Sequence, residues 1–429
     1  MSKSRAPVVL IACCFLAVSG HATDSAEDSQ TDAALTGSVI VQWNQLAYEI
    51  AFAEDQFNTF KGQRALAMMH LAQHDALNSI ARRFEPYALQ RSVPQAEPIA
   101  AAAHAARQVL IAQYPAAQGE IDALLTQQLA ARASPPHRRK LGVELGQAAA
   151  ATILELRTRD GWEVSGTYEF VTDPGAYQTT PDWRGFVVHP GLARAKPFML
   201  KSPAQYRPSG PPPLTSRAYA RSFEEVKGFG AVASSVRTAD QTSYAVWWME
   251  FSEGLVNRLA RRLANERQLE LWATARLFAL MNAALVDTYV AVWDSKYEFN
   301  HWRPYTAIRE AASDANPRTQ PDPQWNSLRP APPFPEYVSA HAAGCACTFA
   351  ILADEFGRNT PLTFDALTAP AGMPTRSFKS LRAAAAECAD SRVRLGFHFR
   401  YSTDAGQEIG WRVATYATKH YLRPERSRG

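Results

Sequence analysis

The sequence predicts an all-α fold made of helical bundles. Two long stretches carry apolar residues at helical spacing, and no run of alternating polar and apolar residues is long enough to predict a sheet. A composition of 46% hydrophobic and 20% charged residues over 429 residues supports a large packed core. The chain is therefore expected to be globular, with room for one large domain or two of ordinary size.

Residues 1–22 are predicted to be a secretory signal peptide. Lys3 and Arg5 form a basic start, an apolar stretch follows up to Gly20, and a small-x-small cleavage site ends at Ala22. The apolar stretch is too short to span a bilayer comfortably. We expect the protein to be exported, to the periplasm or out of the cell.

Two regions are predicted before the C-terminal half. Residues 23–160 form an N-terminal helical region, in which Ala, Leu, Gln and Arg dominate from Phe60 to about Leu156. Frequent prolines then interrupt any long helical pattern. Residues 161–215 are therefore predicted to be a proline-rich connector on the surface.

Residues 216–423 are predicted to be a second helical domain, which carries the chemistry. Its helical periodicity is strongest at residues 268–293, 339–356 and 377–395. The most apolar run, up to Trp293, is interrupted by polar residues, so we expect no membrane span in the mature chain. A formal net charge of +4 is small for this length and gives no reason to expect nucleic-acid binding. The sequence leaves the oligomeric state open, a homo-oligomer included.

Three cysteines, Cys345, Cys347 and Cys388, remain after removal of the signal peptide. One disulfide to Cys388 is one interpretation for an exported protein. The favoured alternative is that all three are small apolar core residues, because a Cys-x-Cys pair alone has no further metal ligands.

Three segments of the C-terminal half each place a cation or a histidine beside a predicted helix end. In the first, Lys296 and Arg303 are seven residues apart, about two helical turns, so a helix puts them on one face. Pro304 disfavours helical geometry at Arg303, and the helix is predicted to end there with both cations free to converge. For this pair alone, a solvated basic face is the alternative.

The second segment leads into an apolar helix with Ser339 as its predicted N-cap. Free backbone N–H groups and the helix dipole favour an anion beside Ser339. A purely structural cap explains Ser339 but leaves His341 unexplained.

In the third segment, Arg392 and His398 are six residues apart, which is off a common face of an ideal helix. Gly396 is suited to end the helix between them, and this break is needed to aim both side chains at one point. Arg394 and Arg400 are predicted to be solvated.

Together the segments resemble the signature of the vanadium-dependent haloperoxidase and type-2 phosphatidic acid phosphatase superfamily. That signature reads K-x6-R-P, then P-S-G-H, then S-R-x5-H-x3-D. The matching residues are Lys296, Arg303, Pro304, Ser339, His341, Ser391, Arg392 and His398. The resemblance covers roughly residues 287–410, and three motifs in the right order make a chance match very improbable.

Three positions depart from the signature. Val338 stands where the family has proline, and Ala340 where it has glycine, although alanine still supplies a backbone N–H. Ser402 occupies the position of the final aspartate, which usually orients the histidine, and Asp404 lies two positions too late. The last departure bears on the basicity of His398, because a histidine ligand is normally fixed by such a partner.

The resemblance implies an oxyanion site with vanadate as cofactor, or a phosphatase site without a cofactor. His398 would bind vanadium directly or attack phosphorus, and His341 would be the acid–base group. The oxyanion-binding groups would be those of Lys296, Arg303, Ser339, Ala340 and Arg392. Lys296 would also polarise bound peroxide, which makes it a catalytic residue in this interpretation.

The favoured function is halide oxidation by hydrogen peroxide, followed by halogenation of an organic acceptor. Trp293 and Phe334 resemble the aromatic wall of the halide pocket in chloride-oxidising members, although core packing would also explain them. A soluble periplasmic acid phosphatase, with His398 as the nucleophile towards a phosphate ester, is the alternative. A third hypothesis, a non-catalytic oxyanion-binding protein, is motivated by Val338, Ala340 and Ser402.

One further pair, His70 and His74, has the i and i+4 spacing that can bind zinc. No glutamate lies between the two histidines, and no third ligand is evident. A structural role is predicted instead, with His74 and Asp75 hydrogen-bonded within the N-terminal bundle.

Overall fold

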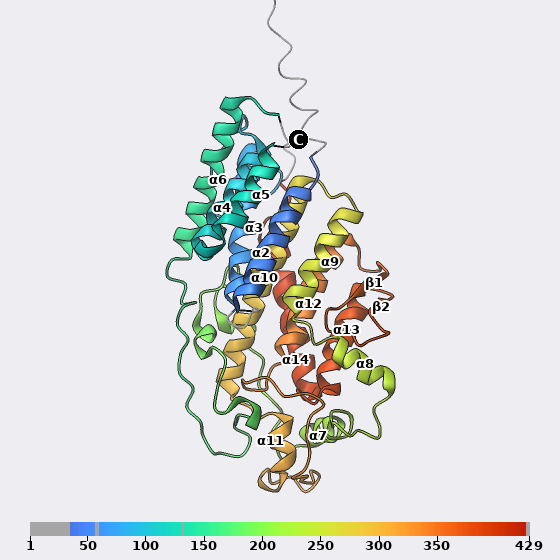
Figure 1. Ribbon diagram of the computed structural model, residues 1–429. Helices are drawn as coiled ribbons and strands as arrows, with labels where there is room; N and C mark the ends of the chain where they lie inside the picture. The colour runs from blue at the N-terminus through green and yellow to red at the C-terminus, as the bar shows by residue number, and fades with distance from the viewer. Residues whose placement is uncertain (1–34, 56–59, 131–132, 426–429) are drawn as a thin grey trace, which may run out of the picture. The chain divides into compact units, whose positions relative to one another are not determined.

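A computed structural model describes residues 35–55, 60–130 and 133–425 (Figure 1). The helices and strands below belong to one compact unit, Thr36–Gly429. The predicted signal peptide at residues 1–22 lies outside the described residues and stays a prediction, as do the predicted region boundaries at residues 160 and 215.

The N-terminal region forms a helical bundle. Its helices are α2 (Ser38–Asp55), α3 (Lys61–Ile80), α4 (Pro98–Gln113), η1 (Pro115–Ala117), α5 (Gln118–Ala130) and α6 (Pro136–Leu156). The innermost is α3, in which every residue from Gly62 to Ile80 is buried. Small residues let α6 approach α4 closely, because a Cβ atom on Gly146 would lie 2.3 Å from the Ala101 carbonyl oxygen.

The C-terminal region is also helical. Its helices are α7 (Arg217–Phe229), α8 (Ala239–Trp247), α9 (Ser252–Glu266), α10 (Leu271–Phe299), α11 (Pro304–Arg309), η5 (Ala311–Ser313), α12 (Ala340–Phe356), α13 (Leu381–Arg394) and α14 (Arg400–His420). The three strongest predicted helices correspond to α10, α12 and α13. The all-α prediction is confirmed.

Helix α10 connects the two regions. It packs against α2 and α3 on one side and against α12 and α14 on the other, and Figure 1 shows it running between the two groups. By length and composition α10 is apolar enough to cross a membrane, but 94% of its most apolar window is buried inside the fold. This burial is typical of the core helix of a globular protein.

Part of the proline-rich connector is buried, although the sequence predicted that it lies on the surface. Three short 3-10 helices, η2 (Pro181–Trp183), η3 (Pro190–Arg194) and η4 (Pro203–Tyr206), each begin at a proline. Between η3 and η4, the backbone N–H groups of Phe198, Met199 and Leu200 donate to the buried Asp287 carboxylate of α10 at 2.6 to 2.7 Å. The surface prediction was wrong for this segment, because a buried carboxylate of α10 satisfies the irregular backbone.

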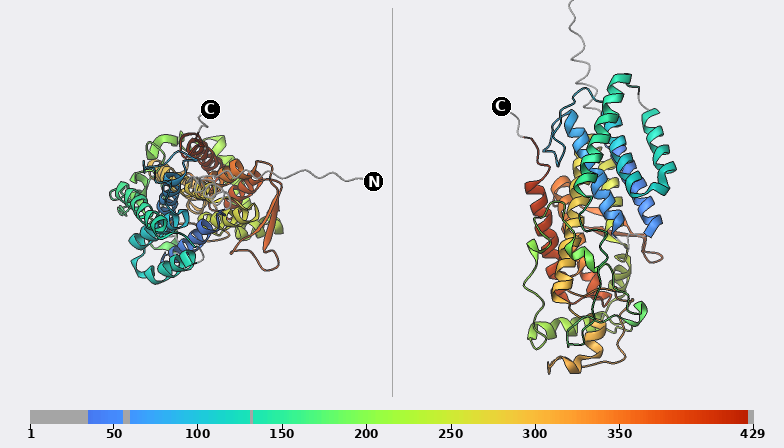
Figure 2. Two further views of the ribbon diagram at one scale, coloured as in Figure 1. Left: turned by 90° about the horizontal axis from the view of Figure 1, so that it is seen from above. Right: turned by 90° about the vertical axis from the view of Figure 1, so that its left-hand side faces the viewer.

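A short antiparallel hairpin departs from the expectation of no sheet. Strand β1 (Leu362–Asp365) pairs with β2 (Thr375–Phe378), with Leu362 opposite Phe378. Each strand is four residues long, which is too short to give a reliable alternating pattern. The hairpin lies at the periphery in the left view of Figure 2. Its Phe364 and Phe378 rings pack against Trp247 and Trp248, respectively.

Cys345 of α12 and Cys388 of α13 form a disulfide, and Cys347 is free and buried. The favoured prediction of three unpaired core cysteines was wrong for Cys345 and Cys388. Their Cα atoms lie 6.6 Å apart across a sequence separation of 43 residues, which only the packing of α12 on α13 reveals.

Candidate active site

Lys296 and Arg303 converge because the helix ends between them, and not because they share one helical face. Helix α10 ends at Phe299, earlier than predicted, and Asn300 caps it in the left-handed conformation with φ 46°. Arg303 then becomes the N-cap of α11. Both side chains are fully buried, and both cationic groups lie 4.8 Å from the centre of the Phe334 ring.

Lys296 holds the loop that precedes α12. Its Nζ donates to the carbonyl oxygens of Pro335 at 2.8 Å, Glu336 at 3.1 Å and Val338 at 2.6 Å. Burial, and then the Arg303 charge, lower the pKa of Lys296 well below its ordinary value, against the opposing effect of Glu336. An ammonium group has three donors, so in this structure each of them is accounted for by backbone.

The Arg303 guanidinium is hydrogen-bonded through Nε and Nη1, whereas its Nη2 is unpartnered among the described residues. Its Nε donates to the Phe334 carbonyl at 2.9 Å and its Nη1 to the Phe397 carbonyl at 3.0 Å. The same Nη1 lies 3.2 Å from His398 Nε2. Within the described residues its buried Nη2 has no hydrogen-bond partner, which leaves one N–H edge of the guanidinium for a ligand.

His398 is held by a carboxylate that the signature did not predict. Glu336 Oε1 lies 2.9 Å from His398 Nδ1 and also accepts from the Phe399 backbone N–H at 3.0 Å. Burial lowers the pKa of His398 well below its ordinary value, and the nearby Arg303 and Lys296 cations lower it further. Burial raises the pKa of Glu336 to about 7, although Arg303 and Lys296 oppose this rise.

Sequence reasoning missed Glu336 because the family motif places the carboxylate four residues after the histidine. Ser402 stands there, and its Oγ lies 3.4 Å from His398 Nδ1. The available signal was a single acidic residue in an otherwise proline-rich and aromatic segment, residues 332–337. A carboxylate in such an apolar segment is rarely buried unless a partner group pairs with it.

Ser339 is the N-cap of α12, as predicted. Its Oγ accepts from the Ala342 N–H at 3.4 Å, and its own N–H donates to the Ser402 carbonyl at 3.2 Å. Ala340 is the first residue of the helix and is partly exposed. Its N–H is one of the donors that a helix start leaves without an intrahelical acceptor.

His341 and Arg392 share the Trp248 carbonyl. That oxygen accepts from Arg392 Nη2 at 2.6 Å and is the backbone hydrogen-bond partner of His341. Burial, and then the Arg392 charge, lower the pKa of His341 well below its ordinary value. Although the residue is partly exposed, His341 Nε2 is buried and has no partner in the described part of the chain.

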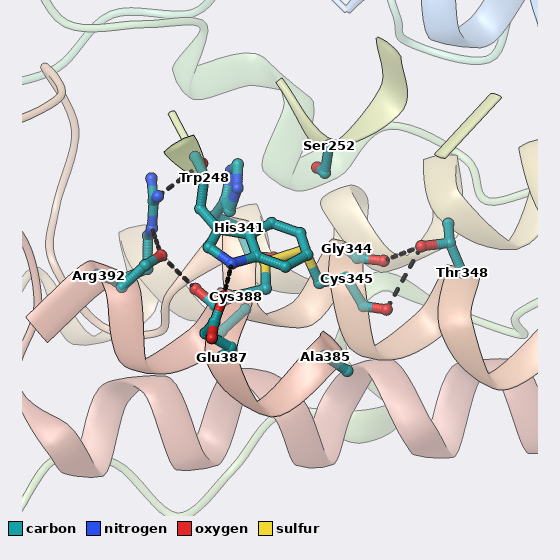
Figure 3. Close-up of a disulfide and its surroundings, with 12 residues drawn as sticks. Trp248, Ser252, His341, Gly344, Cys345, Thr348, Ala385, Glu387, Cys388 and Arg392 are labelled. Carbon is teal, nitrogen blue, oxygen red and sulfur yellow. Dashed lines mark hydrogen bonds between the residues drawn. A yellow bond between two sulfur atoms is a disulfide. The ribbon is translucent and has the colours of Figure 1, made fainter. Parts of the chain in front are cut away.

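The Cys345–Cys388 disulfide lies next to His341 (Figure 3). Cys345 follows His341 by one helical turn on α12, and Cys388 precedes Arg392 by one turn on α13. The ligand atoms of His341, Cys345 and Cys388 lie within 4.8 Å of one another. Because the two sulfur atoms bond to each other, this group offers no thiolates to a metal ion.

Trp293 and Phe334 form an aromatic wall beside the cations. Their ring centres lie 5.1 Å apart, and Phe60 meets Trp293 edge to face at 4.7 Å. Trp293 is almost fully buried, at 1% exposure, whereas Phe334 is partly exposed. The two rings therefore lie against the cationic groups of Lys296 and Arg303.

Arg394 and Arg400 are partly buried in ion pairs rather than free in solvent, contrary to the prediction. Arg394 Nε lies 2.8 Å from Asp390, and Arg400 Nη2 lies 2.6 Å from Glu225 and also pairs with Asp390. The acidic partners come from α7 and from one turn earlier on α13, which sequence alone does not bring together. Both arginines serve these ion pairs rather than the site.

The N-terminal histidines form a fully satisfied network. His70 is buried with Nε2 2.9 Å from Asn44 Nδ2 and Nδ1 2.9 Å from Gln73 Oε1. His74 Nε2 lies 3.0 Å from the Glu85 carbonyl oxygen. Asp75 accepts backbone N–H bonds from residues 87–89 at 2.6 to 2.8 Å. This geometry agrees with the predicted structural role.

The C-terminal residues fit a tetrahedral oxyanion. Lys296, Arg303 and Arg392 bring three cations to a buried region in which Glu336 is the opposing carboxylate. Two buried nitrogen atoms, Arg303 Nη2 and His341 Nε2, lack a partner among the described residues. Excess positive charge with unsatisfied nitrogen atoms suits a vanadate or phosphate ligand.

The sequence comparisons agree with the resemblance over the C-terminal region. The family described as the VCPO second helical-bundle domain matches residues 276–426. Vanadium chloroperoxidase of Curvularia inaequalis is 32% identical over 141 residues, which cover 27% of this chain and 22% of that protein. The chain therefore aligns with about a fifth of the length of this relative.

Solved structures extend the likeness to most of the chain. A bacterial vanadium-dependent iodoperoxidase superposes with a TM-score of 0.77 at 22% identity, covering 91% of this chain and 99% of that one. The apo form of a bacterial vanadium-dependent chloroperoxidase gives a TM-score of 0.67 at 19% identity, covering 85% and 93% of the two chains. Residues 276–426 thus belong to the vanadium haloperoxidase superfamily that their motifs resemble, and the chain as a whole has the fold of its bacterial members.

Proposed function

We propose that this chain is a vanadium-dependent haloperoxidase-type enzyme that oxidises a halide with hydrogen peroxide. One observation carries the proposal: His398 Nε2, Arg303 Nη2 and His341 Nε2, from three separate segments, are buried nitrogen atoms of one cationic site. The family match over residues 276–426 supports vanadate as the ligand. The aromatic pair Trp293 and Phe334 supports halide as the substrate.

His398 is prepared to bind vanadium through Nε2. With its proton on Nδ1 and directed at the Glu336 carboxylate, the ring keeps its lone pair on Nε2. In this structure that lone pair accepts from Arg303 Nη1 at 3.2 Å, a contact that a vanadium ion would replace. Burial keeps the imidazole neutral, as its lowered pKa indicates. When bound, vanadate would activate hydrogen peroxide towards attack by halide, without a change in the oxidation state of the metal.

The remaining residues would balance charge and move a proton. Arg303 and Arg392 neutralise the oxyanion through N–H groups that stay protonated across the working pH range. Neutral His341 has an unpartnered Nε2 that can accept a proton from peroxide and return it later. Lys296 fixes the loop that carries Ser339 and would donate to a ligand only after giving up one carbonyl.

Halide oxidation tests the proposal directly. Mature protein loaded with orthovanadate should contain about one vanadium per chain by elemental analysis and should oxidise bromide or iodide with peroxide. His398→Ala should lose both the metal and the activity. Vanadium-loaded protein that fails with both halides from acidic to neutral pH would overturn the proposal.

A soluble acid phosphatase is the second candidate, because a neutral His398 with its lone pair on Nε2 beside Arg303 also suits attack on phosphorus. This function predicts hydrolysis of a chromogenic phosphate monoester by the metal-free protein, with inhibition by vanadate. Lack of turnover with several esters would remove it.

We also propose that the protein is exported, with residues 1–22 as the signal peptide. The Cys345–Cys388 disulfide supports this location, because such bonds persist in oxidising compartments. Secreted or periplasmic protein should begin near residue 23 by N-terminal sequencing. Intact chain confined to the cytoplasm would contradict the proposal.

A further inference from the structure

Among the described residues, Glu336 is the carboxylate in contact with His398. Its Oε1 faces His398 Nδ1 at 2.9 Å, and its Oε2 is buried without a partner in the same part of the chain. The backbone of Glu336 is held on both sides, by donation to the His301 carbonyl at 2.8 Å and acceptance from Lys296 Nζ at 3.1 Å. A single residue therefore connects Lys296 to His398.

The position that the family motif gives to this partner is filled by a hydroxyl. Ser402 Oγ lies 3.4 Å from His398 Nδ1 and the same distance from the Glu336 carbonyl oxygen. A serine at this distance is at most a weak partner and carries no charge. The charged partner of His398 therefore lies in the loop before α12, whereas the motif places it in the first turn of α14.

We propose that Glu336 is the positioning residue of His398 and takes the place of the aspartate that the motif expects at position 402. Its carboxylate accepts a hydrogen bond from Nδ1–H, which fixes the ring rotation and, together with donation from Arg303 Nη1 to Nε2 at 3.2 Å, the tautomer. The role as metal-site partner rests on the proposed function. Control of the tautomer does not, because it concerns the free protein.

A merely structural role is the competing explanation, since Oε1 also accepts the Phe399 N–H at 3.0 Å. Glu336→Ala removes both hydrogen bonds and cannot separate the two roles. A second change, Ser402→Asp, places a carboxylate on α14 near Nδ1. It does not replace the hydrogen bonds that Glu336 makes from the loop before α12. Ser402→Asn has nearly the same size without the charge and serves as the matched control.

The experiment measures the His398 tautomer by 15N NMR of histidine-labelled protein, with His398→Gln to identify the signal. We expect the Nδ1–H form in the wild type and a smaller population of it in Glu336→Ala, where only Arg303 Nη1 still favours it. The population should recover in Glu336→Ala/Ser402→Asp but not in Glu336→Ala/Ser402→Asn. Affinity for orthovanadate, measured by calorimetry, should fall about 10- to 100-fold in Glu336→Ala. Of the two double variants, only the one with Ser402→Asp should recover this affinity.

Two outcomes would overturn the inference: a tautomer unchanged in Glu336→Ala, or equal recovery with aspartate and asparagine at position 402. If Glu336→Ala does not fold, Glu336→Gln keeps the acceptor and removes the charge. It should move the Nδ1–H proton resonance upfield, and an unmoved resonance overturns the inference. A wild type that fails to bind orthovanadate but shows the expected tautomer changes contradicts the proposed function alone.

Discussion

Two buried histidine clusters, one in each half of the molecule, share a depressed histidine pKa but differ in how their polar atoms are paired. Burial lowers the pKa of His70 to about 3 and of His74 to about 4 in the N-terminal bundle. It also lowers the pKa of His341 and His398 well below the ordinary value in the C-terminal bundle. A depressed histidine pKa therefore reports burial in both places and does not identify the site.

What separates the clusters is the state of their polar atoms. Both ring nitrogen atoms of His70 have side-chain partners. In the C-terminal cluster, within the described residues, His341 Nε2 and Arg303 Nη2 have none. Native proteins rarely leave buried polar atoms unpaired, so these two converging nitrogen atoms suit a ligand. In the N-terminal network the histidine rings are paired, and the buried atom without a partner among the residues described there is the neutral Gln63 Oε1.

Removing one histidine from each cluster tests this contrast with the largest effect. His398→Ala should lower vanadium-dependent halide oxidation at least about 1000-fold, because the direct metal ligand is lost. His70→Gln should leave the rate per folded molecule within about two-fold of the wild type. It should cost about 1–3 kcal/mol of unfolding free energy, because it leaves buried partners unsatisfied. Activity and urea denaturation of both variants give the comparison, and a catalytic defect in His70→Gln would break it.

A matched pair of arginines sharpens the same contrast. Burial lowers the pKa of both Arg261 and Arg303 to about 10, but Arg261 donates to Asn44 in the N-terminal network at 2.7 Å. Arg303→Met should weaken orthovanadate binding about 10- to 100-fold, in line with the loss of a hydrogen bond to a charged group. Arg261→Met should leave the affinity unchanged. Calorimetric titration of both variants measures this, and equal losses would show that the effect is only structural.

The helices were largely predictable, because their signals are local. The periodic runs gave α10, α12 and α13, and the capping residue Ser339 gave the start of α12. The end of α10 was placed too late, at Arg303, because Pro304 marks where a helix must have ended and not where it does end. Asn300 in the left-handed conformation ends the helix first.

Contacts between distant segments were not predictable in the same way. The motif spacing indicated which cations and histidines share a site, because family resemblance supplied the long-range information. It could not supply the Glu336–His398 pair or the Cys345–Cys388 disulfide, which depend on how loops and helices of this chain pack. A departure from the motif at Ser402 was the clue that a partner had to come from elsewhere.

The disulfide should contribute to the C-terminal site as well as to stability, because it lies next to His341. Cys345→Ser/Cys388→Ser should lower the free energy of unfolding by about 2–4 kcal/mol, typical of an internal cross-link. Because each cysteine lies one turn from a site residue, orthovanadate affinity should fall as well. Denaturation and titration should be measured on the same sample. Destabilisation with unchanged affinity would show that the helix packing alone holds His341 and Arg392 in place.

The pH dependence of stability also distinguishes the clusters, through a change in slope. His70 binds a proton near its ordinary pKa of 6.5 when unfolded but only near 3 when folded. Between these values the unfolded chain carries more protons, so the free energy of unfolding falls as pH falls, by at most about 1.4 kcal/mol per pH unit for this residue. His70→Gln should make the slope between pH 4 and 6 shallower. Saturating phosphate should also flatten it, because an anion beside His341 and His398 raises their pKa towards the unfolded value. The two effects should add, since the clusters are separate, and urea denaturation across this pH range would show whether they do.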